Sequence, residues 1–170
     1  MDFFYIWENQ PVKRILFFVA LSVFGFSYAQ SETKSDLLQQ DGILIGVHIS
    51  DFPTVEIGYS KYFYSPENTK MPFAGGYGIS VENYFLKDYI MAPKLFVWTN
   101  VIGLNFGGSI PWYSNLEGNN SLKVRLEIGV GAKNWRINLG YNIPIYNHGL
   151  HHIAQTMLSL NYSIPVTKPK

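Results

Sequence analysis

The sequence predicts an all-β fold: a single antiparallel up-and-down β-barrel of about eight strands, preceded by a cleaved signal peptide. Apolar residues alternate with polar or small ones along most of the chain, as in 122–131, and this two-residue period places the two kinds on opposite faces of a strand. Short segments rich in Gly, Asn, Asp and Pro separate these runs, as is typical of turns. A short apolar run near the N-terminus predicts the signal peptide.

The N-terminal segment has the three parts of a signal peptide. Lys13 and Arg14 precede the apolar run 15–26, and small residues at a typical cleavage position follow it. A membrane-spanning helix needs about 20 apolar residues, so the run favours a cleaved signal over a retained anchor. We therefore expect 1–29 to be the signal peptide. The rest of the chain divides into a polar leader, a barrel and a tail: 30–41, 42–166 and 167–170.

Eight runs with strand character follow the leader. They cover 43–50, 55–63, 75–85, 90–98, 101–113, the two halves of 122–145 divided near 132–134, and 153–164. Short turns between most of them favour an antiparallel meander, and eight is the smallest common strand number of a closed membrane barrel. Proline removes a hydrogen-bond donor from a sheet, so we expect interruptions at Pro93, Pro111, Pro144 and Pro165. Pro93 fits its predicted strand least well.

The composition of the polar face indicates whether that face points to water or into the barrel. It carries Gly, Ser and Asn with a few charges of both signs, whereas a solvated face carries Lys, Glu, Asp and Thr at high density. Small residues suit the crowded interior of an eight-stranded barrel, and charges removed from water need partners. The sequence therefore predicts a structural charge network in the lumen, against the alternative of six ordinary surface charges. Its members are Glu56, Glu82, Lys94, Arg125, Glu127 and Arg136.

The apolar face is correspondingly expected to meet lipid. Besides Ile, Val and Leu, it carries Trp112, Trp135, Tyr141 and Tyr162. Aromatic girdles at both membrane interfaces are typical of such barrels, although aromatic residues also favour strands in general.

No motif in the sequence supports catalysis or cofactor binding. The chain lacks a GxSxG nucleophile motif and a phosphate-binding glycine loop before a helix. His148, His151 and His152 cluster in a loop without Cys or carboxylates nearby, so we expect a solvated loop and no metal site. His48 takes the polar parity and is expected to fill the lumen. A formal net charge of +1 gives no electrostatic case for nucleic acid.

Several segments resemble a known group of proteins. The stretches GYSKYF, APKL, RLEIGVG and LGYNIPI are similar to small outer-membrane β-barrel proteins of the Bacteroidota, most of them uncharacterised, and FSYAQ resembles the signal peptides of that group. The resemblance covers roughly 42–164. It implies an antiparallel barrel in the outer membrane of a Gram-negative bacterium, with outer-membrane lipid and the membrane's assembly machinery as partners. Such barrels usually end on an aromatic residue, whereas this chain continues past Tyr162 to SIPVTKPK.

These observations lead to one expected function and one main alternative. We expect a small, monomeric integral outer-membrane barrel with a structural, adhesive or membrane-integrity role, a lumen filled by side chains, no cofactor and no enzymatic activity. The alternative is a secreted soluble β-barrel or sandwich that binds a small apolar ligand with its apolar face turned inward. A third alternative is a barrel enzyme that acts on lipid or peptidoglycan, but no group of residues in the sequence supports it.

Overall fold

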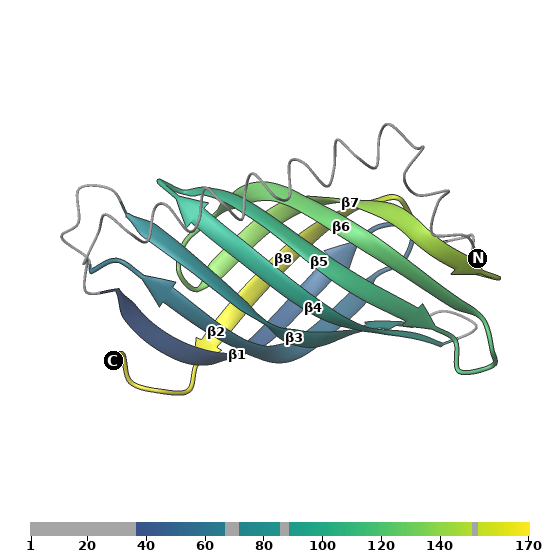
Figure 1. The fold of residues 1–170 in the computed structure, drawn as a ribbon, viewed down its shortest axis with the longest axis horizontal. Coiled ribbons are helices and arrows are strands. Elements are labelled where there is room, and N and C mark those ends of the chain that lie inside the picture. Colours follow the sequence, from purple (N-terminus) through teal and green to yellow (C-terminus); the bar gives the residue numbers. More distant parts are fainter. Residues whose placement is uncertain (1–36, 67–71, 86–88, 151–152) are drawn as a thin grey trace, which may run out of the picture. The chain divides into compact units, whose positions relative to one another are not determined.

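The chain folds into a closed barrel of eight strands, as predicted (Figure 1). The computed structural model describes residues 37–66, 72–85, 89–150 and 153–170, so the predicted signal peptide lies outside the described residues. The strands are β1 (Leu38–Ile49), β2 (Thr54–Tyr64), β3 (Phe73–Tyr84), β4 (Ile90–Val101), β5 (Leu104–Ser114), β6 (Asn120–Gly131), β7 (Trp135–His148) and β8 (Thr156–Pro165). Each is antiparallel to its neighbours, and β8 pairs with β1 to close the ring. No helix within these residues has the length and apolar character to cross a membrane.

Because the number of strands is even, the start of β1 and the end of β8 lie at the same end of the barrel, and the two ends therefore differ. The start of β1, the end of β8 and the β2–β3, β4–β5 and β6–β7 connections lie at one end, which we call the terminal end. The other four connections form the loop end. The C-terminal tail stays at the terminal end, where Gln39 and Lys170 exchange backbone hydrogen bonds of 2.9 and 3.0 Å (Figure 1). The residues predicted as a separate tail therefore continue the pairing with β1.

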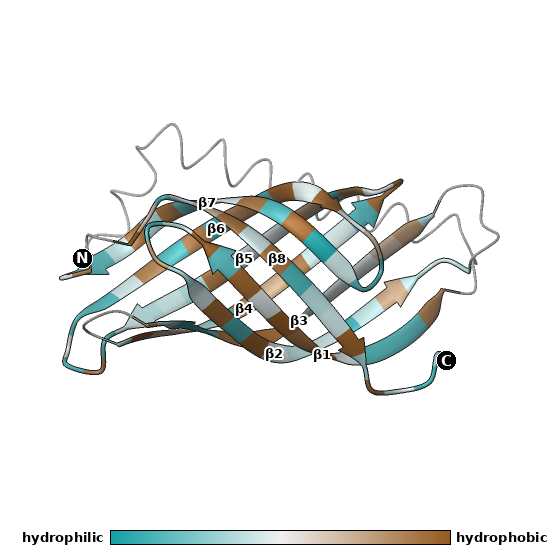
Figure 2. Ribbon diagram, turned by 180° about the vertical axis from the view of Figure 1, so that it is seen from behind, coloured by the Kyte–Doolittle hydropathy of each residue, from teal (hydrophilic) through white to brown (hydrophobic). Residues whose placement is uncertain are grey.

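Side chains alternate between the two sides of the barrel wall. In β8, Met157 and Ser159 are buried in the lumen, whereas Leu158 and Leu160 are exposed on the outside. Figure 2 shows the same alternation as brown and teal bands along the strands. The apolar face therefore points outward and the polar face inward.

At the terminal end, the largest differences from the predicted strand boundaries are at the start of β1 and at the turn between β4 and β5. β1 begins at Leu38, ahead of the expected residue 43, because 38–41 pair with the end of β2. β4 continues through Asn100 to Val101, and the chain turns at Ile102 and Gly103 instead of at 99–100. Both turn residues have positive φ (51° and 84°), which suits a tight hairpin, and the Asn100 side chain accepts a hydrogen bond from the Gly103 amide at 3.1 Å. Asn100 thus supports the turn from within the strand.

At the loop end, the largest differences are at the end of β7 and at the start of β8. β7 extends to His148, a residue expected in a loop, because its pairing with β6 resumes beyond an irregularity between Leu122 and Lys123. Lys123 pairs with Pro144, which has no amide hydrogen to donate, so the irregularity occurs where the ladder is weakest. β8 begins at Thr156 instead of 153, because Ile153 turns into the barrel and is buried.

Pro93 and Pro111 interrupt the sheet near the middle of the wall. Paired residues are missing between β4 and β5 around Pro93, and between β5 and β6 around Pro111. The interruption expected at Pro93 is therefore present, although the residue lies well inside its strand. An apolar groove of about 600 Å³ runs over the outside of the wall in this region, lined in part by Pro93, Leu95 and Trp112.

Two apolar clusters close the lumen on either side of a polar middle. Towards the terminal end, one cluster consists of Tyr62, Tyr64, Ala74 and Trp98. Towards the loop end, the other consists of Tyr84, Ile90, Ala92, Tyr113, Leu150 and Ile153. Leu150 and Ile153 come from the described parts of the β7–β8 connection, and these two side chains cover the loop end of the lumen. The polar middle between these clusters is the candidate site.

Candidate functional site

The six charged residues predicted to face the lumen all take the inward parity. Five are buried and Glu127 is half-buried. They come from five strands: Glu56 from β2, Glu82 from β3, Lys94 from β4, Arg125 and Glu127 from β6, and Arg136 from β7.

Two carboxylates lie side by side at the centre of this region. Glu56 and Glu82 are direct cross-strand partners, and their side chains are fully buried. Like charges directly opposite each other destabilise a sheet, and a buried carboxylate without a partner is costly. The pair is therefore stable only if cations lie close to both residues.

Lys94 supplies the first cation. Its Nζ lies 3.0 Å from Glu56 Oε1 and 2.7 Å from Glu82 Oε1, so one ammonium group bridges both carboxylates. Its neighbour on β3 is Ser80, whose small side chain leaves room for the lysine to reach across the sheet. On the other side, Gly46 lies opposite Glu56, and a Cβ there would be 3.1 Å from the carboxylate.

Arg125 supplies the second cation from three strands away around the ring. Its guanidinium binds Glu82 through two nitrogens: Nη1 to Oε1, and Nη2 to Oε2 at 2.9 Å. Nη2 also donates to the Tyr113 hydroxyl at 2.6 Å, and Nε donates to Asn142 at 2.9 Å. Bidentate pairing of this kind is strong and directional. The contact ties opposite sides of the barrel together through its interior.

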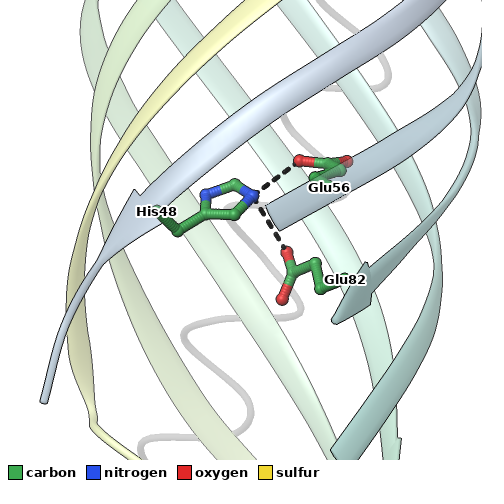
Figure 3. Close-up of side chains that lie close together, drawn as sticks. All are labelled: His48, Glu56 and Glu82. Carbon is green, nitrogen blue, oxygen red and sulfur yellow. Dashed lines mark hydrogen bonds and ion pairs between the residues drawn. The ribbon is translucent and has the colours of Figure 1, made fainter. Parts of the chain in front are cut away.

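His48 joins the network at Glu56, a contact that the sequence did not predict. Its Nε2 lies 2.7 Å from Glu56 Oε2 and 3.7 Å from Glu82 Oε1 (Figure 3). Because an ionised carboxylate only accepts hydrogen bonds, this nitrogen carries the proton. Asn161 of β8 donates to the same Glu56 oxygen at 2.8 Å. The inward parity of both residues was visible in the sequence, but their shared partner depends on the closure of β8 onto β1.

His48, Glu56 and Glu82 together have the composition of a metal site, and Figure 3 shows them converging. Their potential ligand atoms lie within 4.8 Å of one another. However, the Lys94 ammonium lies against both carboxylates, and Arg125 occupies both oxygens of Glu82. A divalent ion would have to displace Lys94, so the ammonium already serves as the cation of this cluster.

Glu127 and Arg136 face the lumen but make no ion pair within the described part of the chain. Glu127 accepts hydrogen bonds from Asn138 at 3.1 Å and Ser109 at 3.5 Å. Arg136 lies over the Trp98 ring, 4.2 Å from its centroid, in a cation–π contact. The structure thus brings four of the six predicted residues into one ion-pair network and places these two beside it.

Lys123 was not among the residues predicted for the network, although it lies on the same strand face as Arg125. The side chain is buried, donates to the Ile153 carbonyl at 2.9 Å and lies 5.4 Å from the Tyr113 ring centroid. Four cationic side chains therefore face three carboxylates in the described lumen. The alternation could have identified Lys123 as a lumen residue. The carbonyl group that it binds lies in a loop whose path the sequence does not define.

The lumen is densely filled around these groups. A cavity of about 10 Å³ lies among Glu56, Lys94, Glu127, Arg136 and other residues, which is room for about one water molecule. Every oxygen of Glu56 and Glu82 lies within contact distance of a donor group. Such carboxylates are held in place and have no space for a substrate beside them, so the arrangement is suited to stabilising the barrel.

Comparison with known proteins gives no relative for this barrel. The chain matches no protein-family model, no curated protein and no solved structure.

Proposed function

We propose that the chain is a small integral β-barrel of the outer membrane of a Gram-negative bacterium, with a structural, adhesive or membrane-integrity role and no catalytic activity. The observation that carries this proposal is the distribution of charge across the barrel wall. Among the charged residues in the eight strands, only Asp41 and Lys61 take the outward parity, and both lie near the terminal end. The remaining outer surface is formed by apolar, aromatic and a few uncharged polar side chains.

Such a surface suits lipid and not water. Exposed large hydrophobic side chains occur on all eight strands, including Ile45, Ile57 and Leu126. A soluble protein rarely exposes a contiguous apolar patch of more than a few hundred Å², whereas a membrane barrel requires one. The soluble alternative needs an apolar interior to hold its ligand, and the interior carries the charges instead.

Aromatic residues at both ends of the wall also support the proposal. Trp135 and Tyr162 are cross-strand partners at the terminal end, where Phe63 and Tyr77 are in ring contact at 6.2 Å. Trp112 lies near the loop end, where Phe85 and Tyr89 are in contact at 6.3 Å. Aliphatic residues dominate between them. Aromatic girdles at the two interfaces are a feature of membrane barrels.

Single-cysteine labelling tests the proposal directly, because the chain has no cysteine of its own. In intact membranes, Leu126→Cys on the outer wall should react with a lipid-soluble maleimide and resist a water-soluble one. Glu117→Cys, in the exposed β5–β6 loop, is the control and should react with the water-soluble reagent. Rapid reaction of both cysteines with the water-soluble reagent, together with recovery in the soluble periplasmic fraction, would refute membrane insertion.

A further inference from the structure

The charges outside the lumen are separated between the two ends of the barrel. Within the described residues, four lysines lie at the terminal end: Lys61, Lys133, Lys168 and Lys170. Among the described residues, Asp41 is the only acidic side chain at this end. The loop end has the opposite character, with Asp51 and Glu117 and no Lys or Arg in its described part.

None of the four lysines forms an ion pair with a described residue. Lys61 lies opposite Asp41 across the β1–β2 ladder, yet no salt bridge joins them. Lys133 lies over the Tyr64 ring, 4.6 Å from its centroid. The exposed Lys168 and Lys170 belong to the tail that hydrogen bonding holds against β1. The ammonium groups of Lys61, Lys168 and Lys170 are therefore available to an external anion, whereas that of Lys133 lies against Tyr64.

Their position relative to the aromatic girdle indicates which anion. Lys61 projects outward two residues before Phe63, close to the end of β2, and Trp135 begins β7 directly after the turn that holds Lys133. Aromatic residues of a membrane barrel lie at the level of the lipid headgroups, and long lysine side chains near that level extend towards the phosphates. Lys61 and the turn that holds Lys133 thus lie at the level where lipid phosphates would be.

We propose that the terminal end of the barrel binds the phosphate groups of anionic phospholipids, which gather around it in preference to zwitterionic lipids. This proposal rests on the proposed membrane location, and it specifies which class of lipid is bound and at which end of the barrel. The attraction is electrostatic: lysines next to a membrane interface attract anionic lipids, and salt weakens this attraction. The acidic loop end provides no such attraction.

Two tryptophans on the outer wall report on the two ends separately. Trp135 is 41% exposed at the terminal end and Trp112 is 56% exposed near the loop end. The full chain would be reconstituted into phosphatidylcholine vesicles that contain an equal mole fraction of brominated phosphatidylglycerol or brominated phosphatidylcholine. Quenching in Trp112→Phe then reports on Trp135, and quenching in Trp135→Phe reports on Trp112. The remaining tryptophans give the same background in both variants.

We expect brominated phosphatidylglycerol to quench Trp135 about twofold or more over brominated phosphatidylcholine, and to show no such preference at Trp112. Replacing Lys61, Lys168 and Lys170 together by Gln should abolish the preference at Trp135, as should high salt, and replacing them by Arg should retain it. Equal quenching of Trp135 by both lipids, or a preference that survives the Gln substitutions, would overturn the inference while leaving membrane insertion intact. If neither lipid quenches either tryptophan, the membrane location itself is wrong.

Discussion

Glu82→Gln should destabilise the barrel far more than the same substitution at Glu127. Glu82 accepts two hydrogen bonds from Arg125 and one each from Lys94 and Tyr84. Glutamine keeps the volume but removes the charge, which leaves Arg125 without a carboxylate partner. An unpaired buried charge costs about 3–5 kcal/mol, and we expect that loss in the free energy of unfolding. Glu127 is half-buried and accepts only from neutral donors, so Glu127→Gln should cost about 1 kcal/mol.

Equilibrium unfolding in urea, in detergent micelles and again in lipid vesicles, gives the two free energies. The double variant Glu82→Gln/Arg125→Met removes both partners and should be more stable than the sum of the single losses predicts, because no charge is then left unpaired. Equal losses for Glu82→Gln and Glu127→Gln, or strict additivity in the double variant, would refute the view that this ion pair stabilises the barrel.

Three further predictions concern the wall and the centre of the barrel. Leu126→Arg should cost about 2–4 kcal/mol in a bilayer if its position lies near the midplane, and an unchanged urea midpoint in vesicles would contradict this. Gly129→Ala should destabilise the barrel, because the new methyl group would clash with the Ile137 carbonyl. Gly108→Ala should be tolerated, because the atom nearest to its new methyl group is the Arg125 carbonyl oxygen at 3.6 Å. Thermal unfolding that ranks the two variants in the reverse order would show the reasoning to be wrong. Lys94→Ala removes the ammonium group that bridges Glu56 and Glu82 and should destabilise the barrel by about 3–5 kcal/mol, because Glu56 then has no cation beside it in the described part of the lumen except through His48; urea unfolding with an unchanged midpoint would contradict this.

The strand pattern and the facing of each residue were readable from the sequence, because a two-residue period leaves only two choices for every side chain. The period places Glu56 and Arg125 on the polar face of their strands, and the small, sparsely charged residues of that face predicted that it points inward. Their partners could not be predicted in this way, because Arg125 reaches Glu82 across 43 positions of the chain through the curvature of a closed ring. Strand ends were missed for a related reason. Ile102 is a β-branched residue with positive φ, so the turn that contains it could not be recognised from its residue type. Ile153 was predicted to begin the last strand, but it is buried at the loop end instead. No local pattern of residues indicates either feature.

The backbone pairing between Gln39 and Lys170 also has a consequence for how the chain folds. The seam between β1 and β8 joins residues more than one hundred positions apart, such as Gly42 and Pro165, and its last contacts involve the final residue of the chain. The entropy of closing so long a loop is lost before these contacts form, so a topology of this kind folds slowly. During synthesis β1 is made before its partner β8, so the edge of β1 that pairs with β8 stays unpaired until β8 has been made. The ring therefore closes only once β8 is present, and until then this edge has to be kept from pairing with other strand edges.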